Sequence, residues 1–403
     1  MIQLRRRIGD SSGNAEATTP DARYWLRLLA VAFAVRILVV FVALHRMPIV
    51  SDAGEYTDQA RALLHHMRVG AYYWPPGQSY FLTAVFKVAG DSDTVAKASN
   101  IVVDVANAVL AVLLARRLLV DSRAIRLTGW LLALFPSTIL MSGQPYSISL
   151  TMLCLLAAAL LLLQGHDSAR WPYFPAAGAL LGFAVLTRPS TLSVLLALII
   201  VAAVVGRGLS RRRDRRRLRA LAVGSVLFIA AAAAVVAPTV HHNADRGQGL
   251  TVSTANEQNF WFGNNPYTPA YKTWQIGAHP VREFPPEERR YLLRYGIGSP
   301  ARAQRHEMLR EAARFIVHHP AITALRTFDR AQSFWGFDYT PSNDVKHAYR
   351  LARPQQFVLT ALEAIAWIAV GLLALVGLTE GRSLIRRPVA LFMLAIVVSY
   401  ALP

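Results

Sequence analysis

The chain is poor in cysteine and in charged side chains, and each shortage excludes a class of protein. Cys154 is the only cysteine among 403 residues, which excludes an intrachain disulfide and a metal site built on cysteine. Only 17% of the residues are charged, whereas a soluble domain carries about 25%. The composition therefore does not favour a soluble globular protein.

Acidic residues are also scarce. The chain has 24 Asp and Glu against 43 Lys and Arg, which gives a net charge of +19. A protein that binds nucleic acid places such an excess in a stripe among polar residues, but here the basic residues stand between apolar runs. We therefore expect no nucleic-acid partner.

Apolar residues make up 54% of the chain and occur in long runs. A helix needs about 20 apolar residues to cross a bilayer. The predicted fold class is thus an all-α polytopic membrane protein with about nine spanning helices. The predicted spans are residues 25–44, 97–115, 126–142, 146–164, 173–187, 190–206, 220–239, 356–378 and 388–402.

The basic residues predict the orientation, because Lys and Arg near helix ends stay on the cytoplasmic side. Residues 207–219 contain eight arginines and one acid, so we place this connection and the N-terminus in the cytoplasm. The expected parts are a disordered cytoplasmic tail at residues 1–23, seven helices at 24–239, a large outer loop with helices at 240–355 and two helices at 356–403. Residues 46–96 form the first outer loop of a protein in the cytoplasmic membrane.

Three ionisable residues fall inside predicted spans: Arg36, Asp104 and Glu363. Such residues are costly in lipid and persist when they pair or line water. Arg36 and Asp104 lie at comparable depth, which predicts an ion pair between the first two helices, with a role in a cavity as the alternative. Asn100 and Asn107 share a helical face with Asp104, so this face is predicted to point into the bundle.

The first outer loop carries the stronger functional signal. Asp52 follows the first helix directly, an amphipathic stretch from Tyr56 to Met67 comes next, and aromatic residues up to Trp74 follow that stretch. An aspartate at the membrane surface beside aromatic rings is suited to take a proton from a hydroxyl nucleophile. The alternative is that Asp52 only caps the helix that follows.

Five short motifs occur in order along the chain. They are Asp52-x-x-x-Tyr56, Pro75-Pro76, Leu-Ala-Arg-Arg-Leu at residues 114–118, Thr187-Arg188-Pro189-Ser190, and Phe262-Gly263-Asn264-Asn265-Pro266. In this order, and on these sides of the membrane, they resemble motifs of the GT-C type membrane glycosyltransferases that use polyprenyl-phosphate sugars. This group includes the protein O-mannosyltransferases and the lipid A aminoarabinose transferases.

The resemblance implies an inverting hexosyl or pentosyl transfer at the outer face of the membrane, within the cell envelope. A polyprenyl-phosphate sugar is the donor, a hydroxyl of a lipid, glycan or protein is the acceptor, and Asp52 is the general base. Aromatic and polar residues of both outer loops are expected to line the substrate pocket. These are Glu55, Tyr56, Trp74, Pro75, Pro76, Trp261, Asn264 and Asn265.

Cationic groups must stabilise the leaving phosphate. Arg188 is the first candidate, because it lies at an outer hairpin tip where the positive-inside rule does not explain an arginine; its alternative role is to anchor lipid headgroups. Lys87 and His242 are further candidates for the donor phosphate. Arg61, Arg68 and His241 face the same compartment and are candidates to supply further charge or hydrogen-bond donors to the phosphate.

Some positions depart from the aminoarabinose-transferase pattern, namely Ala53, Glu55 and Trp74, so the sugar of that branch is not implied. We expect no cofactor. We also expect no metal, although His241 and His242 could meet acids of the first outer loop, because adjacent histidines at a helix end more often bind nothing.

The alternative functions are a transporter or flippase of polyprenyl-linked lipids and a scaffold that binds partners through its outer loop. A transporter would show a repeat of helices and essential charges at mid-membrane depth. The sequence shows no repeat of fixed period, and its densest motifs lie in the outer loops.

Overall fold

The computed structural model describes residues 20–67, 69–119, 121–269, 276, 281–295, 302–380 and 393–398. Regular secondary structure in these residues is helical, in agreement with the predicted all-α class. The expected N-terminal tail lies almost entirely outside the described residues, as does most of the predicted ninth span at 388–402.

Six helical segments in the described part of the chain are long and apolar enough to cross a membrane. They are Ala22–Ala43 (α2, Ala22–Ile37, continued by η3, Leu38–Ala43), α5 (Asp93–Leu118), α8 (Ser147–Ser168), Pro189–Arg211 (η4, Pro189–Thr191, and α10, Leu192–Arg211), α11 (Arg215–Asp245) and Arg353–Val376 in α18 (Arg353–Glu380). The helix α9 (Tyr173–Thr187) is apolar but shorter. The expected count of about nine is therefore not confirmed.

The predicted span at residues 126–142 is broken into α6 (Ser122–Leu134) and α7 (Pro136–Met141). Pro136 has no N–H group, so the carbonyl of Leu132 loses its helical donor at this break. Arg36 of α2 supplies the missing hydrogen bonds: its guanidinium donates to the carbonyls of Ala133 at 2.9 Å and of Leu132 at 3.2 Å. The side chain is 1% exposed.

The predicted ion pair between Arg36 and Asp104 does not form among the described contacts. Arg36 instead holds the break in the α6–α7 segment, and Asp104 accepts a hydrogen bond from Ser142 at 2.5 Å. Asn100 and Asn107, on the same face of α5, donate to backbone carbonyls of the neighbouring chain segments. The prediction that this face points into the bundle is thus confirmed, although the pairing partner was wrong.

The helices α8, α9 and α11 form the densest part of the bundle. Gly178 and Gly182 stand one turn apart on α9, and a Cβ on either would lie under 3.0 Å from the backbone of α11 at Phe228 or Ala232. Small residues at such positions let two helices approach closely, which is a common packing mode in membranes. This contact fixes the end of α9, where the predicted Thr-Arg-Pro turn begins.

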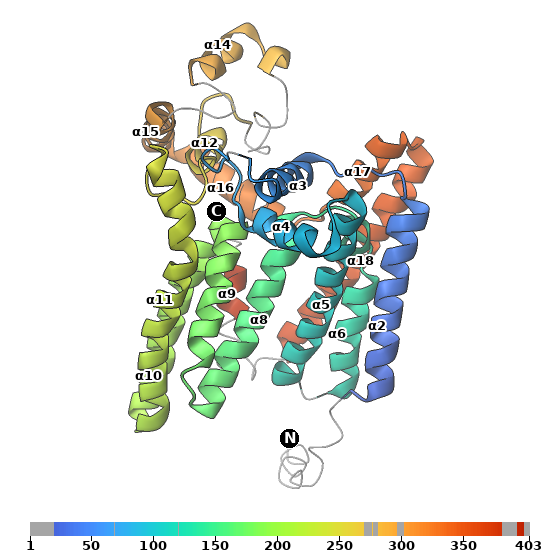
Figure 1. The fold of residues 1–403 in the computed structure, drawn as a ribbon, viewed down its shortest axis with the longest axis vertical. Coiled ribbons are helices and arrows are strands. Elements are labelled where there is room, and N and C mark those ends of the chain that lie inside the picture. The colour runs from blue at the N-terminus through green and yellow to red at the C-terminus, as the bar shows by residue number, and fades with distance from the viewer. Residues whose placement is uncertain are drawn as a thin grey trace.

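Both outer loops lie at one end of the bundle, opposite the turn between α10 and α11 (Figure 1). The first loop forms α3 (Ser51–Leu64) and α4 (Gly77–Ala89), which lie across the ends of the spanning helices. The second loop forms α12 (Asn256–Gly263), η5 (Val281–Glu283), α14 (Pro286–Arg294), α15 (Arg302–His318), α16 (Pro320–Phe334) and α17 (Thr340–Tyr349).

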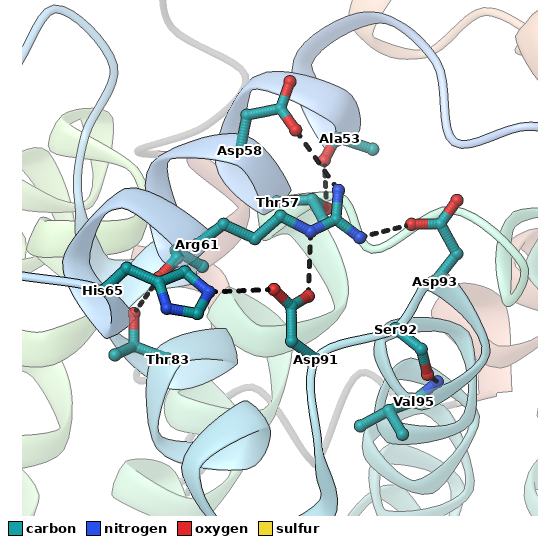
Figure 2. Close-up of polar contacts among 11 residues, drawn as sticks. Ala53, Thr57, Asp58, Arg61, His65, Thr83, Asp91, Ser92, Asp93 and Val95 are labelled. Atoms are coloured by element: carbon teal, nitrogen blue, oxygen red, sulfur yellow. Dashed lines mark hydrogen bonds and ion pairs between the residues drawn. The ribbon is translucent and has the colours of Figure 1, made fainter. Parts of the chain in front are cut away.

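A single arginine ties the first loop together (Figure 2). Arg61 on α3 pairs with Asp91 at 2.8 Å and with Asp93 at 2.7 Å, at the start of α5, and with Asp58 at 3.3 Å. His65 also approaches Asp91, at 3.5 Å. Exposed pairs contribute little each, but this network restricts how α3 can rotate against α5. The charge of Arg61, which the sequence offered for a donor phosphate, is engaged here.

The role of Arg36 can be tested by stability. Changing Arg36→Met removes the side-chain donor of the buried Ala133 carbonyl and one of the two side-chain donors of the Leu132 carbonyl, and an abandoned buried acceptor costs about 1–3 kcal/mol. We expect a clear fall in the melting temperature of the purified protein. The control is Arg27→Met, which changes an exposed arginine on the same helix; equal melting of the two variants would contradict the role of Arg36.

Candidate functional site

A cavity of about 670 Å³ lies where the outer loops meet the ends of α8 and α9. Its walls come from segments that are far apart in the sequence. They are the start of α3, residues 74–75, the start of α8, the turn at residues 187–190, residues 253–259 and residues 338–340. Both Asp52 and Arg188 line this cavity.

Asp52 lies in the first turn of α3 and is half-buried. The N-cap position belongs to Val50, which has no side-chain capping bond, so Asp52 does not occupy the capping position that was its alternative role. Ser51, just before it, adopts a φ of 55°, a left-handed conformation that costs a non-glycine residue about 1–2 kcal/mol. Such strained residues concentrate at functional sites.

Burial raises the pKa of the Asp52 carboxyl above its ordinary value. The positive charge of Arg188 and the hydrogen bond from Ser51 act in the opposite direction. A carboxylate with a raised pKa is a stronger base than an exposed aspartate, and the nearby cation keeps it ionised. The cavity therefore holds a base and a cation that influence each other.

Arg188 follows the last residue of α9 in an extended conformation, with φ −146° and ψ 107°. The preceding Thr187 is fully buried, and its hydroxyl donates to the carbonyl of Ala184 at 2.7 Å and lies 2.8 Å from the hydroxyl of Thr151 on α8. The exposed arginine thus projects from a turn that is anchored in the bundle.

Tyr56 and Trp74 form an aromatic wall of the cavity. Their rings meet edge to face with centroids 6.2 Å apart, and Tyr56 is 4% exposed. The Tyr56 hydroxyl bonds to Ser147 at the start of α8. The sequence predicted that both rings and Pro75 belong to one pocket, and the structure brings them together.

The aromatic segment is held by the second outer loop. The N–H of Tyr72 donates to the side chain of Asn243 at 2.9 Å, and the carbonyl of Tyr72 accepts from Thr254 at 2.9 Å. Ser253 donates to the carbonyl of Tyr73, and the Asn243 amide donates to Thr251 at 2.9 Å. Asn243, which is fully buried, thereby joins the two outer loops.

Gly77 brings the first loop onto the Arg188 turn. A Cβ at this position would lie 2.6 Å from the backbone of Leu186 and Thr187. Only glycine permits this approach. Pro76, directly before it, is the N-cap residue of α4 and is buried. Pro76 was predicted to line the substrate pocket, but it lies at the start of the helix and not in the cavity wall.

Three predicted pocket residues of the second loop lie away from the cavity. Trp261 is fully buried in the core of that loop and donates to the hydroxyl of Tyr291 at 3.1 Å. Asn264 donates to the carbonyl of Phe260, and Asn265 donates to that of Trp261, each at 2.9 Å. These side chains fold the loop because a Gly-Asn-Asn-Pro segment leaves backbone groups that need partners.

The other predicted charges are also outside the cavity lining. Glu55 is exposed on α3, and Lys87 is exposed near the end of α4. His242 stacks on Tyr72 at 4.5 Å and bonds to the carbonyl of Gly70 at 2.9 Å. His241 pairs with Asp245 at 3.4 Å. Arg68 lies outside the described residues.

The sequence did not point to several residues that line the cavity. Asp338 is exposed there and accepts the N–H of Thr340 at 2.9 Å. Burial together with the negative charge of Asp344 raises the pKa of Tyr146 to about 12. Asn256 and Asn259 add amide groups. No spacing in the sequence links these positions to Asp52.

In the part of the chain that the structure describes, no group of three or more His, Cys, Asp or Glu side chains is placed to hold a metal ion.

Residues 74–237 match the family model described as dolichyl-phosphate-mannose-protein mannosyltransferase. The matched stretch contains Trp74 and Arg188 but not Asp52. The match confirms the resemblance to GT-C type membrane glycosyltransferases that the order of the motifs indicated. No curated protein matches the chain.

A solved structure that resembles the chain is the crystal structure of ArnT from Cupriavidus metallidurans in the apo state. The two sequences are 18% identical, the TM-score is 0.46, and the alignment covers 94% of this chain and 76% of the other.

The contact at Gly77 predicts a stability effect. Gly77→Ala places a Cβ against the backbone of the Arg188 turn, and such overpacking costs about 1–3 kcal/mol. We expect a lower melting temperature of the purified protein. Gly70→Ala is the matched control, because nothing lies within 4 Å of a Cβ there. Unchanged melting of the Gly77 variant would show that the two segments do not touch.

Proposed function

We propose that the chain moves a sugar from a polyprenyl-phosphate donor to an acceptor hydroxyl, and that the reaction takes place in the cavity between Asp52 and Arg188. Residues 74–237, which match the mannosyltransferase family model, support this proposal. The observation that carries this proposal is the meeting of a half-buried carboxylate and an exposed guanidinium in one cavity of about 670 Å³. The two residues come from different outer connections of the bundle.

The proposed reaction is a single displacement. The acceptor oxygen forms a bond to the anomeric carbon, Asp52 takes the proton of the hydroxyl, and the bond between the anomeric carbon and the phosphate oxygen breaks. The phosphate leaves with the electron pair of that bond, and Arg188 stabilises its charge. Attack opposite the leaving group inverts the anomeric configuration.

The cavity walls suit a sugar. Tyr56 and Trp74 offer apolar ring surfaces, and Asn256 and Asn259 offer amide donors and acceptors for sugar hydroxyls. Tyr146 also lines the cavity, and besides burial the negative charge of Asp52 contributes to the raised pKa of its hydroxyl.

The polyprenyl tail of the donor is proposed to lie in a groove of about 530 Å³ between α2, α5 and α8. The groove is lined by apolar residues, among them Phe33, Val105 and Leu153. On α8, Ile148 lines the cavity and Leu153 lines the groove, a separation of about 7.5 Å along the helix axis and about 140° around it. A donor whose tail lies in the groove would therefore pass around α8 to place its phosphate in the cavity.

The transporter alternative receives no support from Arg36 or Asp104. Arg36 bonds to backbone carbonyls, and Asp104 bonds to Ser142. Both groups stabilise the bundle, so neither is available to carry a substrate through it.

The proposal predicts that Asp52→Asn inserts and folds normally but loses activity. Loss of a general base lowers the rate by about 10²–10⁴-fold. The measurement is transfer of a labelled sugar from a panel of polyprenyl-phosphate sugars to acceptors in a membrane extract. Asp58→Asn is the control, because Asp58 is exposed on the same helix and does not line the cavity. Full activity of Asp52→Asn, or lipid translocation without sugar transfer, would overturn the proposal.

The raised pKa of Asp52 predicts the pH dependence of kcat/KM. Activity falls as the pH drops through the pKa of the base, and burial moves that fall to a higher pH than an exposed aspartate would give. Because Arg188 opposes the shift, Arg188→Gln should move the acidic limb to still higher pH, besides weakening donor binding. An acidic limb that stays in place in Arg188→Gln would argue against coupling of the two groups.

A further inference from the structure

A second groove, distinct from the one between α2, α5 and α8 and called the groove from here on, lies in the half of the bundle away from the outer loops. It has a volume of about 160 Å³ and its walls come from α8, α9, α10 and α11. Apolar side chains dominate the lining, including Phe174, Leu198, Val205 and Leu221. None of these residues lines the cavity of the proposed reaction.

This groove opens sideways toward the surroundings of the bundle. Ile199 of α10 and Ile229 of α11 both line it, and they are 53% and 52% exposed. Both helices belong to predicted membrane spans. Their exposed side chains therefore face lipid, and a chain that enters the groove comes from the bilayer.

A cluster of arginines stands at the polar end of the same two helices. The turn that joins α10 to α11 carries Arg211, Arg212 and Arg213, and all three are exposed. The first turn of α11 then adds Arg215, Arg216 and Arg217, also exposed. The one ion pair described for these six arginines joins Arg217 to Asp214 at 3.6 Å.

The placement of Arg215, Arg216 and Arg217 is unfavourable for the helix itself. The N-terminus of a helix carries a partial positive charge and unpaired N–H groups, so acidic residues are normal there and basic ones are repelled. The first turn of α11 contains no acid, and the N-cap residue Asp214 accepts the N–H of Arg217 at 3.1 Å. The six arginines thus have one neighbouring carboxylate in this turn, and a further anion at this end would relieve the repulsion among them.

Arg217 and the groove share one face of α11. Arg217, Leu221 and Ser225 follow each other at intervals of four residues, so they form one stripe along the helix, and the last two line the groove. Arg217 is one turn nearer the polar end. A ligand that fits this stripe has a negative head and an apolar chain.

We propose that the groove and the α10–α11 turn together bind an anionic phospholipid of the leaflet on that side. The phosphate lies at the start of α11 among Arg215, Arg216 and Arg217, and one acyl chain lies along Leu221 in the groove. Basic pockets between spanning helices are a known mode of recognition for anionic headgroups. The site is separate from the proposed glycosyltransferase reaction and does not depend on it.

The test compares two lipids with the same dioleoyl chains, phosphatidylglycerol and phosphatidylcholine, by native mass spectrometry of the purified full chain in detergent. We expect phosphatidylglycerol to bind at least about tenfold more tightly, a difference that several neutralised arginines can supply. Equal binding of the two lipids would overturn the proposal.

Two variants separate the parts of the site. In Arg215→Gln/Arg216→Gln/Arg217→Gln, binding of phosphatidylglycerol should fall to the level of phosphatidylcholine. Arg123→Gln/Arg126→Gln removes two exposed arginines at the start of α6 and should leave the preference intact. If both variants lower binding equally, the site is not at this turn.

The groove is tested by Ala202→Phe, which fills it from α10 and should weaken binding of the long-chain lipid. Inorganic phosphate at the same concentration should not displace phosphatidylglycerol, because it lacks the acyl chain. If phosphate displaces the lipid, or if the groove-filling variant folds and binds normally, the arginines alone attract anions and the proposed site is wrong.

Discussion

The candidate site depends on how residues 72–77 are held between the bundle and the second outer loop. On one side, Gly77 lies against the backbone of Leu186 and Thr187 so closely that no side chain fits between them. On the other side, Tyr72 is bonded to Asn243 and to Thr254. This segment therefore fixes the aromatic wall against the Arg188 turn. Without this segment, the first outer loop, the turn at residues 187–190 and the second outer loop would not be held in fixed positions around the cavity.

A second constraint lies deeper in the bundle. Pro136 breaks the segment after α5, and the carbonyls that it frees would be costly in a membrane interior. Arg36 satisfies them from α2. Arg36, which was predicted to form an ion pair or to line a cavity, therefore has a structural role. Arg36 also packs the broken segment against α2. The α7 part of that segment contacts α17, and α17 directly follows the part of the cavity wall that contains Asp338.

The two ends of the molecule differ in how charge is used. At the outer-loop end, the half-buried Asp52 and the exposed Arg188 influence each other in one cavity. At the opposite end, the arginines of the α10–α11 turn are exposed and nearly without acidic partners among the described residues. The first arrangement is suited to proton transfer and phosphate stabilisation within a cavity. The second is suited to a charged surface such as lipid headgroups.

The sequence by itself determined the all-helical membrane class and most helix positions, and it selected Asp52, Tyr56, Trp74 and Arg188, which line one cavity, because long apolar runs and short motifs are local properties. Only the tertiary structure decided which of the other candidates reach the cavity. Trp261 and Asn265 carry the right chemistry, yet they serve the loop core, and Asp338 enters the cavity without any motif. The reason is that a pocket wall is set by contacts between distant segments, and one sequence does not record those contacts.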